Sequence, residues 1–158
     1  TDTSSNDIMA LPTSGDAKAV PVVATPFSEN YAKLSPDGRW LAYTSDESGR
    51  SEVYVTSFPE VTGKWQVSTD GGDFPRWRGD GRELYYLAPG NVLTAVSVSG
   101  TATGFTVERP QMRFKTNPPN QPWYPYAVTG DGQRFLVNTN LAAPSPLTVI
   151  VNWTAALE

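Results

Sequence analysis

A nine-residue pattern built around an Asp-Gly pair occurs three times in this chain. The first copy, residues 35–43, reads Ser-Pro-Asp-Gly-Arg-Trp-Leu-Ala-Tyr, and weaker copies follow at residues 78–86 and 129–137. In each copy, two polar or mixed residues follow the Asp-Gly pair and precede a hydrophobic run. The pattern therefore predicts, three times over, a tight turn that leads into a β-strand.

The chemistry of the turn explains the shared residues. An Asp side chain bonds its own backbone two residues on, and Gly takes the positive φ of a hairpin turn without steric cost. Asp37 and Asp80 are 43 residues apart, and Asp80 and Asp131 are 51 apart. A spacing in the forties is typical of a four-stranded propeller blade. We expect an all-β chain, a β-propeller fragment of about three four-stranded antiparallel blades, with the three Asp residues serving the turns.

Strand and turn patterns divide this single partial propeller domain, residues 1–158, into successive units. These units are a half blade at 7–24, blades at 29–68 and 73–107, and an incomplete blade at 122–153. Residues 109–122 hold four prolines and are predicted to be a connecting loop. Thr154 is predicted to cap a short helical turn. Because the chain begins inside a repeat, we expect it to be a fragment of a longer parent.

The repeats resemble those of TolB-type, WD-repeat-like β-propellers. The resemblance rests on residues 35–43 and on Glu-Val-Tyr-Val at 52–55. Residues 63–68, Gly-Lys-Trp-Gln-Val-Ser, and residues 147–153, Leu-Thr-Val-Ile-Val-Asn-Trp, are similar to the last blades of propellers attached to bacterial serine/threonine kinases. The resemblance implies a bacterial protein and, as in many relatives, a periplasmic or other extracytoplasmic location. It is informative about fold and does not fix an activity.

Composition narrows the classes of function. The chain has a net charge of -4 and 12 scattered basic residues, which argues against a nucleic-acid partner. It has no His and no Cys, so a Ser-His-Asp triad, a Cys-His pair and the usual zinc sites are not available to it. No run approaches the roughly 18 apolar residues of a membrane span, so no membrane insertion is expected.

A ring that contains incomplete blades exposes sheet edges and apolar faces. A propeller has about four to eight blades around a channel, and the terminal blades predicted here are incomplete. We therefore expect a homodimer in which two chains of about three blades each complete a six-bladed ring.

Aligning the three copies on Asp-Gly predicts which residues lie at the channel and its mouth. Equivalent positions hold Asn30, Asp73 and Tyr124, and likewise Lys33, Arg76 and Ala127. In one interpretation Arg76 and Arg78 bind an anionic or carboxylate group while Trp123, Tyr124 and Tyr126 supply apolar contact. In the more common alternative Trp77, Trp123 and Tyr126 pack between neighbouring blades and the two arginines are solvated. The candidate ligand-binding residues are Asn30, Asp73, Arg76, Arg78, Trp123, Tyr124 and Tyr126.

Two acidic segments contain oxygen ligands suited to a hard cation such as calcium. They are residues 45–49, Ser-Asp-Glu-Ser-Gly, and residues 69–73, Thr-Asp-Gly-Gly-Asp. Neither has the ligand spacing of the twelve-residue calcium loop. We expect no cofactor and keep calcium as the alternative.

Three functions are compatible with these observations. The first is a noncatalytic binding or assembly module that presents loops and a channel mouth to a protein or small ligand. The second is a lactonase- or esterase-like hydrolase that uses channel carboxylates such as Glu29 and Asp73, assisted by calcium. The third is a purely structural self-assembling fragment, which differs from the first only in having no ligand. The sequence contains no recognisable catalytic constellation, which favours the first.

Overall fold

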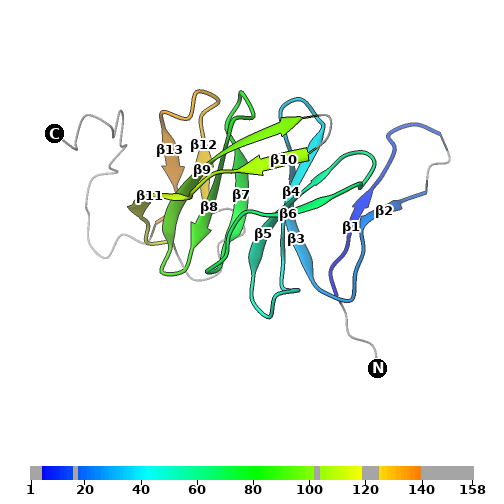
Figure 1. Ribbon diagram of the computed structural model, residues 1–158, viewed down its shortest axis with the longest axis horizontal. Coiled ribbons are helices and arrows are strands. Elements are labelled where there is room, and N and C mark those ends of the chain that lie inside the picture. Colours follow the sequence, from blue (N-terminus) through cyan, green and yellow to red (C-terminus); the bar gives the residue numbers. More distant parts are fainter. Residues whose placement is uncertain (1–4, 16–17, 102–103, 119–124, 140–158) are drawn as a thin grey trace.

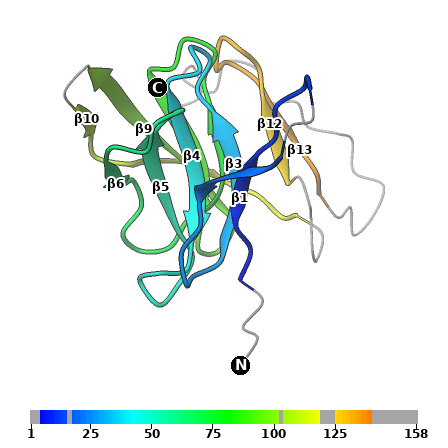
Figure 2. The same cartoon turned by 90° about the vertical axis from the view of Figure 1, so that its right-hand side faces the viewer.

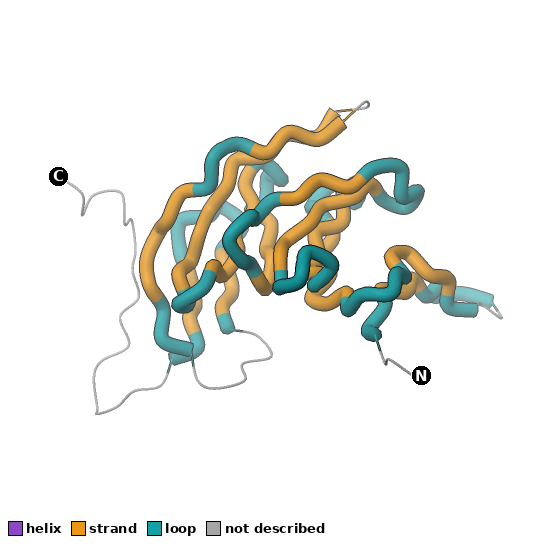
Figure 3. The backbone as a smooth tube through the Cα atoms, turned by 60° about the horizontal axis from the view of Figure 1, so that its bottom comes forward, coloured by secondary structure: helices purple, strands orange, loops and turns teal. Residues whose placement is uncertain are grey.

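A computed structural model describes residues 5–15, 18–101, 104–118 and 125–139. Every regular element in these ranges is a β-strand, and none is a helix (Figure 3). No helix in the described part of the chain is long and apolar enough to span a membrane. The predicted strand at 147–151 and the predicted helical turn at Thr154 lie outside the described residues.

Four antiparallel sheets follow one another in chain order across the molecule (Figure 1). The first sheet pairs β1 (Ile8–Ala10) with β2 (Val20–Val23). Figure 2 views the molecule from the end that this sheet occupies. The second has the order β3-β4-β5-β6, with β3 at Glu29–Leu34, β4 at Trp40–Ser45, β5 at Glu52–Ser57 and β6 at Lys64–Gln66.

The third sheet contains five strands rather than the expected four. It has the order β10-β9-β8-β7, with β7 at Asp73–Trp77, β8 at Glu83–Ala88, β9 at Val92–Thr101 and β10 at Gly104–Val107. β11 (Gln111–Lys115) pairs with β9 as well, where a loop was predicted. The fourth sheet pairs β12 (Tyr126–Val128) with β13 (Phe135–Val137).

The three Asp-Gly turns have the same geometry. Asp37, Asp80 and Asp131 each accept, at Oδ1, a hydrogen bond of 3.0–3.1 Å from the backbone N–H two residues on. The following glycines have φ of 70°, 72° and 72°, in the left-handed region that glycine adopts without a steric penalty. At Asp37 the hydroxyl of Ser35 also donates to the carboxylate, and this bond together with those from Arg39 lowers the pKa of Asp37 to about 2. The prediction that these residues serve the turns is confirmed.

Alternating side chains of the middle strands fill three separate cores between the sheets. On β4, Trp40 and Ala42 face β8 and β9, whereas Leu41 and Tyr43 face the β1–β2 sheet. On β8, alternate residues likewise divide between the core shared with β4 and the core shared with β12 and β13. Each middle sheet is therefore buried on both faces, as stacked propeller blades require.

Candidate functional site

The innermost strands β3 and β7 each contain a β-bulge at the same position of the repeat. The register of β3 with β4 shifts between Asn30 and Lys33, and that of β7 with β8 shifts between Asp73 and Arg76. Inside each bulge one aromatic residue has a left-handed backbone, Tyr31 with φ 57° and Phe74 with φ 58°. Bulky residues rarely adopt this conformation, and bulges are common beside binding sites.

Neighbouring blades hold both bulges in place. The rings of Tyr31 and Phe74 are in contact, with centroids 4.2 Å apart. The carbonyl of Lys33 accepts a 2.9 Å hydrogen bond from Trp77 Nε1, and the carbonyl of Phe74 accepts one of 2.8 Å from the Tyr126 hydroxyl. These interactions offset the cost of the left-handed backbone and fix the side chains on either side of it.

Asp73 lies in a cavity at the start of β7. The cavity has a volume of about 300 Å³. It is lined by Arg50, Ser51, Gly71, Gly72, Asp73, Phe74 and residues 87–91. A Cβ on Gly72 would lie 2.6 Å from Ser68 Oγ, so only glycine allows the chain to pass this close to the neighbouring blade. The Asp73 side chain and the Phe74 ring thus share one hollow between two blades.

Burial raises the pKa of the Asp73 carboxyl to about 6. The hydroxyl of Ser51, and then that of Thr44, oppose this shift, while the charge of Glu52 adds to it. The hydroxyl of Thr44 is buried and lies near enough to Asp73 to affect its pKa. Its geometry does not satisfy a hydrogen bond to any described residue. The described residues provide no ion pair for Asp73, so its charged form is destabilised.

Glu52, the second carboxylate near this cavity, is fully engaged. It accepts hydrogen bonds from the Ser68 hydroxyl and, at 2.9 Å, from the backbone N–H of Gly71. Arg50 Nε lies 3.1 Å from Oε1, the same oxygen that accepts from Gly71. Glu52 therefore stabilises the loop that forms the cavity, and of these two carboxylates Asp73 is the one without an ion pair among the described residues.

Lys33 and Arg76 come together on adjacent inner strands. Burial, and secondarily the Arg76 guanidinium, lower the pKa of Lys33. Arg76 donates to its neighbouring carbonyl of Pro75 at 2.8 Å and lies over the ring of Tyr126, 5.8 Å from the centroid. The repeat alignment placed Lys33 and Arg76 at equivalent positions, and the fold makes them neighbours.

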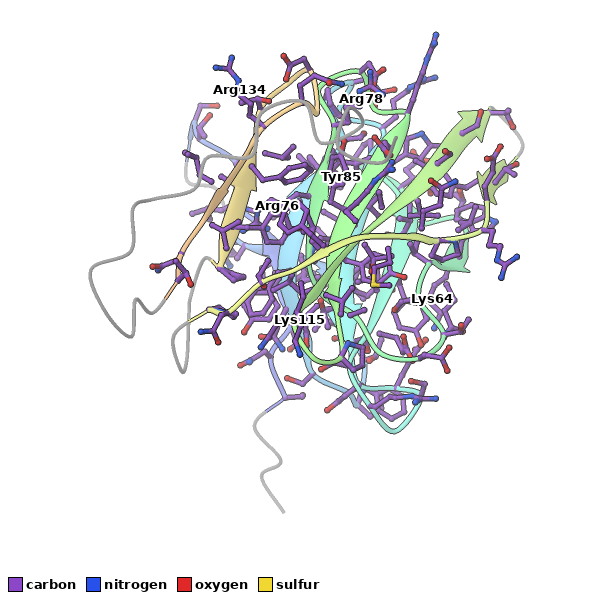
Figure 4. The ribbon with its side chains drawn as sticks, turned by 90° about the vertical axis from the view of Figure 1, so that its left-hand side faces the viewer. Lys64, Arg76, Arg78, Tyr85, Lys115 and Arg134 are labelled. Carbon is purple, nitrogen blue, oxygen red and sulfur yellow. The ribbon has the colours of Figure 1, made fainter. Side chains whose placement is uncertain are left out.

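The other predicted site residues occupy different surroundings. Asn30 is half-buried and accepts at Oδ1 a 2.9 Å hydrogen bond from Asn6. Tyr126 is 3% exposed and belongs to the core between the third and fourth sheets. Arg78 lies apart from Arg76, beside Tyr85 (Figure 4). Trp123 and Tyr124 lie outside the described residues.

The proposed carboxylate pair of Glu29 and Asp73 is not formed. Glu29 is 2% exposed, and its Oε1 accepts hydrogen bonds from the hydroxyls of Thr25, at 2.5 Å, and Ser45, at 3.3 Å. Tyr43, whose pKa is raised by burial and further by the charges of Glu47 and Glu29, faces the β1–β2 sheet. Glu29 is thus on the opposite face of the second sheet from Asp73.

The two acidic segments considered for calcium have other contacts. Asp46 accepts a 2.9 Å hydrogen bond from the backbone N–H of Ser28, and Glu47 pairs with Lys64 at 2.5 Å. Within the described ranges, no group of three or more acidic, His or Cys side chains is arranged to hold a metal ion.

Sequence reasoning did not identify the aromatic pair, Tyr31 and Phe74, or the hydroxyls beside Asp73. The pair carries a detectable signal, because the two aromatic residues are separated by the same 43 residues as the Asp-Gly turns. The hydroxyls of Ser51 and Thr44 have no such signal in the sequence, because these residues approach Asp73 only through the packing of one blade on the next.

The fold is similar to that of solved β-propeller structures. TolB from Acinetobacter baumannii is 13% identical with a TM-score of 0.54, and the match covers 80% of this chain and 30% of TolB. A candidate 6-phosphogluconolactonase from Bacteroides uniformis is 18% identical with a TM-score of 0.55, covering 88% of this chain and 43% of that one. An oligogalacturonate lyase from Vibrio parahaemolyticus is 15% identical with a TM-score of 0.50, and the match covers 82% of this chain and 35% of the lyase.

The chain spans less than half the length of each of these structures. No family model matches its sequence, and no curated protein matches it. At these identities the likeness concerns the fold alone, and the three neighbours carry the names of different activities. The expected all-β architecture, a β-propeller segment that resembles TolB, is confirmed.

Proposed function

We propose that this propeller segment is a noncatalytic binding module whose ligand surface lies at the start of its innermost strands. The observation that carries the proposal is Asp73, a half-buried carboxylate with no described ion pair, fixed in a cavity by a braced bulge. A buried carboxylate without a cation favours a ligand that supplies one. The ligand class is therefore a primary ammonium group, such as that of a peptide N-terminus or a lysine side chain.

Phe74 adds a second reason for this ligand class. Its ring lines the same cavity as Asp73 and contacts Tyr31, which is 38% exposed. An aromatic face attracts an ammonium group and covers the alkyl chain that carries it. A hydrolase would require a second catalytic group near Asp73, and Glu52, the carboxylate whose charge acts on Asp73, is engaged by Ser68, Gly71 and Arg50. The binding function is therefore the better supported of the two.

Titration with propylammonium chloride tests this function. We expect saturable shifts of the Phe74 and Gly72 amide resonances at pH 7.5, and at least roughly tenfold weaker affinity in Asp73→Asn because a charge-assisted hydrogen bond is lost. Asp70→Asn, an exposed carboxylate in the same loop, is the matched control and should bind like wild type. Equal affinity in Asp73→Asn would refute the proposal, and binding of calcium alone would indicate a metal site in its place.

We also propose that two chains assemble through their terminal sheets and complete a ring of about six blades. Each terminal sheet shows two strands among the described residues, with unpaired backbone edges. Large apolar side chains are exposed on both sheets, Met9 at 48%, Val20 at 52% and Leu136 at 68%. A second copy would cover these side chains and pair these edges.

Light scattering during size exclusion measures this assembly. We expect the mass of a dimer for wild type at micromolar concentration and that of a monomer for Val20→Lys, because a charge on the apolar face opposes burial. Met112→Lys adds a charge at a 70% exposed position of β11, in the third sheet, and should remain dimeric. A monodisperse wild-type monomer would rule out the assembly and leave the Asp73 proposal untouched.

A further inference from the structure

A second cavity, of about 190 Å³, lies between the third sheet and the turn that joins β12 to β13. It is lined by Arg78, Glu83, Tyr85, Arg113, Gly132, Gln133 and Phe135. Figure 4 shows Arg78 toward the same end of the molecule as Arg134. This cavity shares no lining residue with the one that contains Asp73.

The one carboxylate that lines this cavity already has two hydrogen-bond donors. Arg113 Nη2 donates to Glu83 Oε1 at 2.6 Å, and the Tyr85 hydroxyl donates to Oε2 at 2.7 Å. Both oxygens of Glu83 are thus engaged. Its charge is balanced by Arg113, whose side chain is only 17% exposed.

Arg78 brings a further positive charge that has no comparable partner. Its Nη1 lies 3.8 Å from Glu83 Oε2, and its Nε lies 3.6 Å from Asp80 Oδ1. Both distances exceed that of a hydrogen bond. The structure shows no hydrogen bond from the Arg78 side chain to another described residue, and Nε is buried without an acceptor. A guanidinium has five N–H donors, so Arg78 lines the cavity with donors to spare.

The neighbouring turn holds Arg78 in this position. Gly132 has φ 72°, and a Cβ there would lie 2.5 Å from the Tyr85 hydroxyl and 3.2 Å from Arg78 Cδ. The backbone N–H of Gly79 donates to the carbonyl of Gly130 at 2.9 Å and ties the two Asp-Gly turns together. The guanidinium is therefore placed by two rigid turns, an arrangement that lowers the entropic cost of binding a ligand.

We propose that Arg78 binds a small oxyanion, the carboxylate or phosphate group of a ligand, in this cavity. A guanidinium matches two oxygens of such a group with two parallel N–H donors. The charge of Arg113, 2.6 Å from Glu83, compensates that carboxylate and so limits its repulsion of the anion. The sequence alone suggested that Arg76 and Arg78 share one anion. The fold separates them, and Arg78 acts with Arg113 instead.

Arginine side-chain NMR tests this site directly in the wild-type chain. Titration with sodium phosphate and with sodium acetate, at ionic strength held constant with sodium chloride, should shift the Arg78 Nε–H resonance saturably. The tighter of the two anions identifies the source of the oxyanion. A shift that is absent, or that chloride reproduces, would overturn the proposal without any variant having to fold.

Two variants separate binding from general charge effects. In Arg78→Gln we expect at least roughly tenfold weaker anion affinity, read from the Gly132 amide, because the charged hydrogen bonds are lost. Arg134→Gln removes an exposed arginine at the adjacent turn and should bind the anion like wild type. Wild-type affinity in Arg78→Gln, with its amide spectrum otherwise preserved, would contradict the assignment. Because the probe is an anion and the residues differ, this test is independent of Asp73.

Discussion

Replacing Trp40 by alanine is expected to lower the free energy of unfolding by about 3–5 kcal/mol, the range for large aromatic residues in a core. Trp40 is 8% exposed in the core between the second and third sheets. Its ring centroid lies 4.8 Å from that of Phe105 and 5.5 Å from that of Trp65. Gly100 packs against the same ring so closely that a Cβ there would lie 2.2 Å from Trp40 Nε1. One side chain thus holds two blades together.

Urea unfolding followed by far-UV circular dichroism measures this loss, since the signal of the strands does not depend on the tryptophan that the variant removes. Met112→Ala is the matched control, because Met112 is 70% exposed on β11, and its effect should stay within about 0.5 kcal/mol. A loss below about 1.5 kcal/mol in Trp40→Ala would mean that the blades are held mainly by their own hydrogen-bond ladders.

The blades could be predicted from the sequence because their signals are local. The Asp-Gly turn depends on a side chain that bonds a backbone N–H two residues away, and each copy contains all the atoms required. The hydrophobic runs that follow the turns alternate between two cores, as strands buried on both faces do. Strand positions in the second and third sheets follow these signals to within a few residues.

β11 could not be predicted because its cause is tertiary. Residues 111–115 are five residues that follow Pro110, and the prolines of the surrounding segment indicated a loop. The strand forms because β9 is long: β10 pairs with its end at Val98–Thr101, and its start at Val92–Ala95 is left with an open edge. A strand edge offers unpaired backbone groups, and the returning chain pairs with them.

The candidate site was only partly accessible to sequence reasoning for a similar reason. Alignment of the repeats identified Asp73 and Arg76, because equivalent positions of a repeat face equivalent surroundings. It did not show that Tyr126 would be buried, or that Arg78 would meet Arg113 across 35 residues of chain. The bulges at Tyr31 and Phe74 also interrupt the alternation of side chains between the two faces of the strand. The odd or even position of a residue along β3 or β7 therefore no longer predicts which face its side chain occupies.

Raising the pH from 4 to 7 is expected to destabilise wild type relative to Asp73→Asn by up to about 3 kcal/mol. The folded state raises the pKa of Asp73 from 3.8 to about 6. Between these values the folded chain binds more protons than the unfolded chain, so its stability falls as the pH rises. The stability that the protonated Asp73 carboxyl adds to the folded chain is fully present below about pH 4 and is lost above about pH 6. Effects of other carboxyl groups, such as Asp37, are common to both proteins and cancel in the difference.

Urea unfolding of both proteins at pH 4, 5, 6 and 7 measures this linkage. A difference in stability that stays constant with pH, or that changes in the opposite direction, would show that Asp73 is not held in a desolvated site. The same experiment with propylammonium chloride connects stability to binding. An ammonium group that pairs with the carboxylate favours its charged form, so the pH-dependent loss should shrink in wild type while Asp73→Asn stays unchanged. The loss of stability that ionised Asp73 causes in the ligand-free chain is then the free energy that a bound ammonium group restores.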